Sequence, residues 1–211
     1  VAIRGDKILH VGAPKKMDSF VGPETKVVDL GEQLIMPGLH DAHLHAFMSG
    51  LYADPKVKVS LTDTSEEQCV AGLADVADLV PKDKWLMGAG WYHPLWDNPV
   101  MPTKHSLDEV YPDRPVVMVS GDGHTMWLNS YGMKLLGIDR NTPDTPGGFI
   151  DRDENGEPTG TFHEAAASSL CQAIYNFPAD EIDGFYENFM RILNSYGITS
   201  ICDMSMMAVP G

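Results

Sequence analysis

Short apolar segments that read as strands alternate with amphipathic segments that read as helices, and this alternation constrains the fold of the chain. Ser65 and Gln68 form a capping-box pattern that begins a helix, and apolar residues recur at helical spacing as far as Val80. Asn129 is expected to cap a short helix that runs to Leu136, and further helices are expected over 164–175 and 180–195. Strands alternating with helices predict an α/β fold with a mainly parallel sheet. The expected core strands are residues 39–45, 85–91, 116–120 and 198–203.

The 211 residues suffice for one large domain or a domain with a smaller partner. Four core strands are too few for a closed (β/α)8 barrel, which takes ~250 residues. The chain is therefore either a smaller open sheet or part of a longer protein.

Three segments stand apart from this alternation. Residues 1–36 read as a small β unit, residues 92–113 as a proline-rich loop, and residues 139–160 as a hairpin with a polar tip. The loop is long enough to form a lid or pocket wall, but an inert surface excursion remains an open alternative. Within the β unit, strands are expected at residues 1–3, 7–11 and 26–30.

Composition limits the partners of the chain. A formal net charge of −15 argues against nucleic acid and anionic membranes, because nothing neutralises their charge. No run approaches the ~18 apolar residues of a membrane-spanning helix. Cys69, Cys171 and Cys202 are too few and too dispersed for a disulfide framework, so we expect a cytoplasmic protein.

His43 and His45 form a candidate metal site. If the segment is extended, both imidazoles and Asp41 lie on one face of a strand. Two imidazoles so placed can bind one ion such as zinc, and the carboxylate of Asp41 can accept the second N–H of a ligating ring. A two-residue motif is weak evidence for a metal site, so the alternative remains that one or both are ordinary strand histidines.

The run from Pro37 to His45 resembles the first-strand signature of the amidohydrolase superfamily, metal-dependent hydrolases built on a (β/α)8 barrel. Further segments, in order, resemble amidohydrolase family 3, which includes N-substituted formamide deformylase-like proteins. The resemblance covers nearly the whole chain and is therefore more specific than the two histidines. The matching segments are Trp85 to Trp91, Asp113 to Val116, Asp122 to His124 with Trp127 and Asn129, Thr142 to Gly148, Gly156 to Glu164, and Gly197 to Ser200.

The resemblance implies a particular domain order. Residues 1–36 would be part of an N-terminal β-sandwich, and residues 37–211 the first strands of a partial (β/α)8 TIM-type barrel, interrupted by 92–113 and 139–160. The family takes a bridging lysine, two further histidines and an aspartate base from later strands. None of these follows Asp203, so the sequence resembles the N-terminal portion of such an enzyme.

The implied activity is hydrolysis of amide-type, non-peptide carbon–nitrogen bonds in a small amide-like substrate. One or two divalent ions, with zinc as the expected metal, would be held by His43 and His45 with other ligands, and would lower the pKa of bound water towards ~7. Because catalytic zinc usually takes three protein ligands, this chain alone is expected to show little or no activity. The alternative is a catalytically silent scaffold, or a fragment that forms a homo-oligomer through unpaired strand edges.

His124, Asp122 and Glu164 are the candidate catalytic residues. His124 could polarise substrate at a strand end, and Asp122 could hold its ring in one tautomer. Glu164 could supply a carboxylate in the pocket. The alternatives are a turn histidine bonded to backbone and a first-turn glutamate favoured by the helix dipole.

Trp91, Tyr92 and Trp96 are the candidate wall of the substrate pocket. Buried aromatic residues usually serve only as core, and that alternative remains open for all three. His40 falls on the opposite strand face from His43, so we expect it to be a core histidine with a satisfied hydrogen bond.

Overall fold

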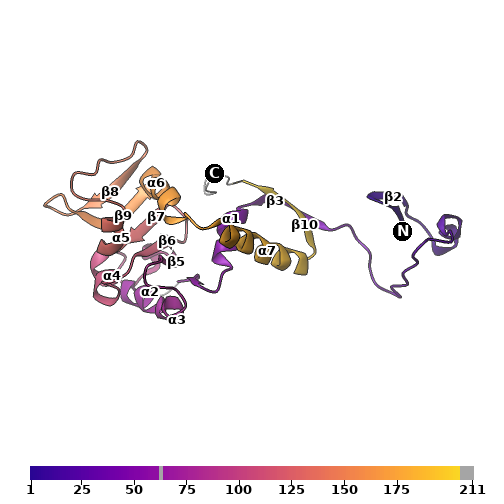
Figure 1. Cartoon of the computed structure of the whole chain (residues 1–211), viewed down its shortest axis with the longest axis horizontal. Coiled ribbons are helices and arrows are strands. Elements are labelled where there is room, and N and C mark those ends of the chain that lie inside the picture. The colour runs from indigo at the N-terminus through magenta and orange to yellow at the C-terminus, as the bar shows by residue number, and fades with distance from the viewer. Residues whose placement is uncertain (62–63, 205–211) are drawn as a thin grey trace. The chain divides into compact units, whose positions relative to one another are not determined.

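The computed structural model of the protein describes residues 1–61 and 64–204. The chain divides into two compact units, Val1–Pro37 and Gly38–Gly211 (Figure 1).

The first unit contains one antiparallel hairpin, β1 (Ala2–Arg4) with β2 (Lys7–His10). Two short 3-10 helices follow, η1 (Pro14–Lys16) and η2 (Asp18–Phe20). The strand expected at 26–30 is wrong, because no neighbouring strand pairs with it in the described part of this unit. A strand needs a partner for its backbone N–H and C=O groups, whatever its own propensity.

The described residues of the second unit form two separate sheets. Strand β3 (Leu39–Leu44) pairs in parallel with β10 (Ile198–Asp203), and the two form a two-stranded sheet. The other sheet has six strands, of which the first three in spatial order are parallel and the last three antiparallel. Its order is β4 (Val57–Lys58), β5 (Leu86–Trp91), β6 (Val116–Ser120), β7 (Thr125–Leu128), β9 (Pro158–Glu164) and β8 (Gly148–Arg152).

This division corrects the expectation of one mainly parallel sheet. β5 and β6 were expected in the same sheet as β3, but they belong to the six-stranded sheet, and β3 pairs only with β10 among the described strands. An apolar run indicates that a strand is buried and does not indicate which strand it pairs with. The fold is a mixed α/β fold.

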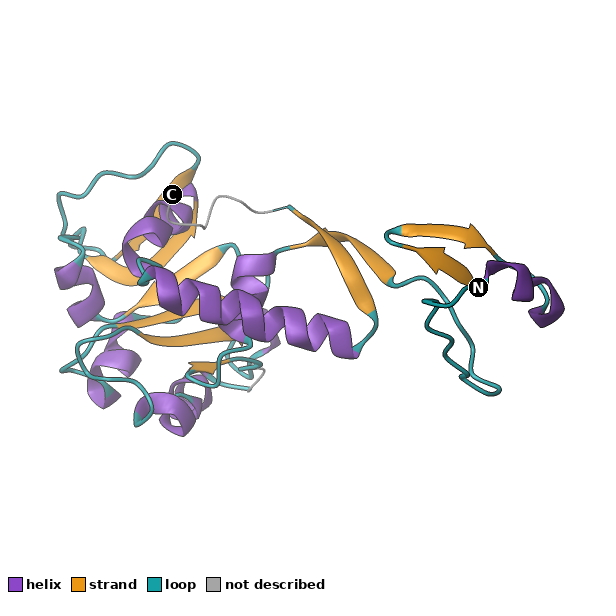
Figure 2. Ribbon diagram, turned by 45° about the vertical axis from the view of Figure 1, so that its right-hand side comes forward, coloured by secondary structure: helices purple, strands orange, loops and turns teal. Residues whose placement is uncertain are grey.

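Helices cover both faces of the six-stranded sheet (Figure 1). Along β6, Val117 and Val119 face one helical layer, and Val116 and Met118 face the other. The first layer comprises α1 (Ala46–Tyr52), α5 (Ser130–Leu135), α6 (Ala165–Ile174) and α7 (Ala179–Ser195). The second layer comprises α2 (Glu66–Gly72), α3 (Ala74–Ala77) and α4 (Lys104–Val110). Helix α7 leads into β10 (Figure 2).

Segment 92–113 is not the unstructured loop that the sequence suggested. It contains η3 (His93–Leu95) and α4, whose Leu107 is fully buried against the second core. Helix α4 has seven residues and one buried apolar side chain, so it shows no helical repeat of apolar positions in the sequence.

Both expected helix caps are confirmed. The hydroxyl oxygen of Ser65 accepts the N–H of Gln68 at the start of α2. The amide oxygen of Asn129 accepts the N–H of Gly132 at the start of α5. The same buried side chain also accepts the N–H of Val116 and donates to two carbonyls, so it joins α5 to the sheet.

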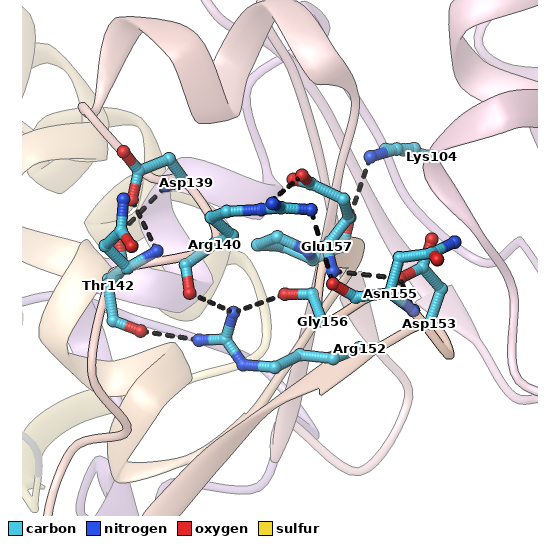
Figure 3. Close-up of polar contacts among 11 residues, drawn as sticks. Lys104, Asp139, Arg140, Thr142, Arg152, Asp153, Asn155, Gly156 and Glu157 are labelled. Carbon is cyan, nitrogen blue, oxygen red and sulfur yellow. Dashed lines mark hydrogen bonds and ion pairs between the residues drawn. The ribbon is translucent and has the colours of Figure 1, made fainter.

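The β8–β9 hairpin is held by arginine side chains (Figure 3). The guanidinium of Arg152 donates to the carbonyls of Arg140, Thr142 and Gly156. Arg140 in turn pairs with Glu157 at 2.7 Å. These contacts dock the segment before the hairpin onto the hairpin itself.

Candidate active site

His43 and His45 lie at the carboxyl end of β3, where the chain turns into α1. Both side chains are exposed, and their ring centroids are 5.4 Å apart with the ring planes nearly perpendicular. With Zn–N bonds of ~2 Å, two rings this close can reach a common ion. The pair therefore fits part of a metal site.

Two carboxylates lie near this strand end. Asp41 accepts the backbone N–H of His43 at 3.0 Å, so its oxygen supports the chain rather than an imidazole nitrogen. Asp203, at the end of β10, accepts the N–H of Ala46 at 3.3 Å. The sequence reasoning did not single out Asp203, although the rule that functional side chains follow parallel strand ends would have found it.

Within residues 1–61 and 64–204, no group of three or more His, Cys, Asp or Glu side chains is arranged to hold a metal ion. Within these residues the chain thus supplies two imidazoles, fewer than the three protein ligands usual for catalytic zinc, and the nearby carboxylates do not complete the group.

The other candidate residues gather at one edge of the six-stranded sheet. β5, β6 and β9 end at this edge, and β7, which is antiparallel to β6 and β9, begins there. The topology therefore brings together His93, Asp122, His124 and Glu164, which stand at or next to those strand ends.

Glu164 and His124 form the closest pair at this edge. Oε2 of Glu164 lies 2.8 Å from Nδ1 of His124, and both side chains are more than half exposed. The hydrogen bond and the negative charge of Glu164 raise the pKa of His124 above its ordinary value. The backbone of Glu164 has φ 54° and ψ −121°, a strained conformation for a residue with a side chain.

Asp122 has a different partner from the one expected. Its carboxylate accepts the Ser120 hydroxyl and the backbone N–H of His124, so the carboxylate on the His124 ring is that of Glu164. Partial burial raises the pKa of Asp122, but these hydrogen bonds and the His124 charge outweigh it and leave the pKa lowered. Glu164 lies 40 positions from His124 in the sequence, so local spacing pointed to Asp122 as the partner of the His124 ring.

His93 is a further member of this edge that sequence reasoning left unassigned. Partial burial lowers its pKa, Asp122 acts in the opposite direction, and His163 adds to the lowering. The signal in the sequence was its position directly after a strand.

Of the three expected wall residues, only Tyr92 is at the surface, with 40% of its area exposed. Trp91 and Trp96 are buried in the second core, and the Trp91 indole N–H donates to the carbonyl of Met118. Both indoles therefore act as core side chains. His40, expected in a core, is exposed, with Nδ1 2.7 Å from the Ser200 hydroxyl.

A cavity of about 360 Å³ lies elsewhere in the second unit, between the first helical layer and the sheet. Its lining includes Leu51, Trp85, Phe177 and Phe185. Among the described residues that line it, none belongs to the candidate site.

Known proteins resemble this chain in sequence and in fold. The protein named putative amidohydrolase YtcJ, from Bacillus subtilis (strain 168), is 34% identical to this chain over 158 residues. The match covers 74% of this chain and 29% of YtcJ. N-substituted formamide deformylase of Arthrobacter pascens is 30% identical over 219 residues, 99% of this chain and 39% of that protein. The chain spans roughly a third of the length of these relatives.

An uncharacterized metal-dependent hydrolase from Pyrococcus horikoshii OT3 has a similar fold, with a TM-score of 0.59 over 82% of this chain and 32% of that chain, at 21% identity. The mixed α/β fold is thus one that metal-dependent hydrolases use. The sequence profile of the amidohydrolase family matches residues 26–209, so the chain belongs to the amidohydrolase family.

In the part of the chain that the structure describes, no helix has both the length and the apolar composition to cross a bilayer.

Proposed function

We propose that this chain carries the first part of the active site of a metal-dependent hydrolase that cleaves amide-type, non-peptide carbon–nitrogen bonds. The observation that carries the proposal is the position of His43 and His45 at the carboxyl end of β3, beside its parallel neighbour β10. Active sites of parallel α/β folds lie at that end of the strands. The family membership supports the same chemistry.

The β3–β10 pair is proposed to be the start of a (β/α)8 barrel. Parallel sheets are normally covered on both faces, yet Leu39 and Ile201 are 47% and 36% exposed here. Further strands would cover them. The six-stranded sheet is then a layer inserted between two neighbouring barrel strands, and residues 1–36 are proposed to belong to a β-sandwich.

His43 and His45 would hold a divalent ion, with zinc proposed, and Asp203 and Asp41 would stand beside it. The metal, when bound, supplies hydroxide at neutral pH. The chain's own residues then have separate tasks. Asp41 fixes the backbone directly before His43, because it accepts the N–H of His43.

At the sheet edge, the His124–Glu164 pair is proposed to orient a small amide-like substrate. A protonated His124 can donate from Nε2 to a substrate oxygen while Glu164 holds Nδ1. Asp122 fixes the backbone of His124, and Tyr92 offers an exposed aromatic surface at the same strand end. The cytoplasmic location and a homo-oligomeric state remain predictions.

Metal uptake tests the proposal. The 211-residue chain should bind zinc in dialysis with elemental analysis, and a chain with both His43→Ala and His45→Ala should lose that zinc. His105→Ala, at an exposed position on α4, is the matched control and should keep it. Zinc that is equally present in the double variant would contradict the assignment of the two histidines.

The second candidate, a catalytically silent scaffold, is favoured by the incomplete donor set within the described residues. Zinc uptake separates the two, because the silent scaffold binds no metal at His43 and His45. We expect little or no hydrolysis of simple N-acyl or formamide substrates by this chain alone. Clear hydrolysis that is lost in the histidine double variant would reject the silent scaffold.

A further inference from the structure

His163 joins three neighbouring strands. Thr125 of β7, His163 of β9 and Phe149 of β8 are cross-strand partners. Nε2 of His163 lies 2.9 Å from Oδ2 of Asp151, and Nδ1 lies 3.3 Å from the Thr125 hydroxyl. The Phe149 ring stacks on the imidazole with centroids 4.3 Å apart and planes 14° from parallel. The ring is therefore held at both nitrogens and on one face.

The Asp151 carboxylate has a second donor, because the Thr161 hydroxyl donates to the same oxygen at 2.7 Å. An ionised carboxylate only accepts hydrogen bonds, so Nε2 of His163 carries a proton. The His163 side chain is 12% exposed. Such a buried, satisfied network fixes one arrangement of its strands.

Carboxylate, imidazole and hydroxyl follow one another here in the order of a hydrolase triad. Thr125, however, is 8% exposed and lies within a paired strand, so a substrate carbonyl has no approach to its oxygen. The network instead fixes the position of His163, the residue directly before Glu164.

Glu164 follows His163 directly and has a strained backbone, with φ 54° and ψ −121°. Its N–H donates to the carbonyl of His124, and Gly148 packs directly against the turn that follows. A residue keeps such a conformation only when its surroundings enforce it. The fixed His163 on one side and the start of α6 on the other supply that enforcement.

We propose that Asp151, His163 and Thr125 form a positioning array that holds Glu164 in its strained conformation and thereby keeps its carboxylate on Nδ1 of His124. His163 is a positioning residue: it acts through Glu164. This inference rests on the proposed role of the His124–Glu164 pair.

The tautomer of His124 reports on the array. Above the raised pKa of His124 the ring is neutral, and a carboxylate on Nδ1 favours the Nδ1–H form. Ring nitrogen NMR shifts of the full 211-residue chain give the ratio of the two forms. Glu164→Gly removes the carboxylate and suits the positive φ, so it defines the ratio without an acceptor.

His163→Phe keeps an aromatic ring against Phe149 and removes both nitrogens, and Thr125→Val removes one hydroxyl from a similar shape. Both should move the ratio from predominantly Nδ1–H towards the value of Glu164→Gly. Thr159→Val is the control. Its hydroxyl also belongs to the hairpin but donates to the backbone carbonyl of Asp151 and to no side chain of the array, so the ratio should stay unchanged.

An unchanged ratio in both array variants would overturn the positioning role, and Thr125→Val decides the matter alone if His163→Phe does not fold. If Glu164→Gly also leaves the ratio unchanged, the His124–Glu164 pair does not exist in solution and the proposed substrate role fails with it. If only the metal-site proposal fails, because zinc does not bind at His43 and His45, the tautomer ratios of His124 should still be those expected here.

Discussion

Glu164 is tied to His124 twice: its carboxylate meets the His124 ring at 2.8 Å, and its backbone N–H donates to the His124 carbonyl at 2.8 Å. The carboxylate contact favours the protonated, charged form of the His124 ring. The backbone hydrogen bond fixes the distance between the two residues. The pair is thus part of the sheet ladder and of the candidate site at once.

The charge of the pair should appear in a pH titration. Glu164 raises the pKa of His124, so Glu164→Gln should lower the titration midpoint of that ring in histidine NMR spectra. The stabilisation from the pair is fully present below the ordinary pKa of histidine, and it is lost as pH rises through the raised pKa. Glu154→Gln, at the hairpin tip, should leave the His124 midpoint unchanged. A midpoint that Glu164→Gln does not move would contradict the pair.

Asn129→Ala should destabilise the protein by about 3 kcal/mol, because it leaves several buried backbone groups without partners. Urea unfolding followed by tryptophan fluorescence measures the change. Asn141→Ala, at an exposed turn position, should change the unfolding free energy by less than about 0.5 kcal/mol. Similar losses in the two variants would contradict the structural role of Asn129.

Two glycines give opposite predictions for the same substitution. At Gly148 a Cβ atom would lie 2.2 Å from the Ala166 nitrogen and 2.4 Å from the His163 carbonyl oxygen, so Gly148→Ala should cost about 3 kcal/mol. At Gly184, inside α7, a Cβ meets nothing within 4 Å, so Gly184→Ala should stabilise by about 0.5–1 kcal/mol. Thermal unfolding of both variants checks the pair, and a stabilised Gly148→Ala would show that the turn is looser than described.

Arg152→Lys should cost about 1–2 kcal/mol, because an ammonium cannot reach the three carbonyls that the planar guanidinium joins (Figure 3). Arg191→Lys is the control. Its exposed pair with Glu187 lies along one helix and should contribute less than about 0.5 kcal/mol. Chemical denaturation compares the two, and equal effects would argue against the docking role of Arg152.

Local patterns predicted local structure well. Ser65 and Asn129 begin helices as expected, and the apolar runs at 85–91 and 116–120 are buried strands. The pairing of the strands could not be predicted, because a buried strand has the same apolar sequence pattern in either sheet. Short helix α4 was missed for lack of a repeat, and Val27 with Val28 showed strand propensity without a strand to pair with.

The strand-end positions of the candidate site residues could be predicted from the sequence, but the contacts between their side chains could not. His43, His45, Asp122 and His124 were singled out as candidates at expected strand ends, and the structure places them at or next to such ends. The contact of Glu164 with His124 spans 40 positions and depends on three antiparallel pairings, which no local spacing reveals. Trp91 looked like a pocket wall because apolar character alone does not separate core from surface.

The placement of a whole six-stranded layer between β3 and β10 also has a kinetic consequence. His40 and Ser200 meet across 160 positions of sequence, and joining such distant segments carries a large loop-closure entropy when the intervening chain is unfolded. Once the intervening layer has condensed through its many short-range pairings, the effective loop is far shorter. We therefore expect the histidine-bearing strand to gain its neighbour late in folding, and a mutation that weakens the layer to slow assembly of the candidate metal site without touching it.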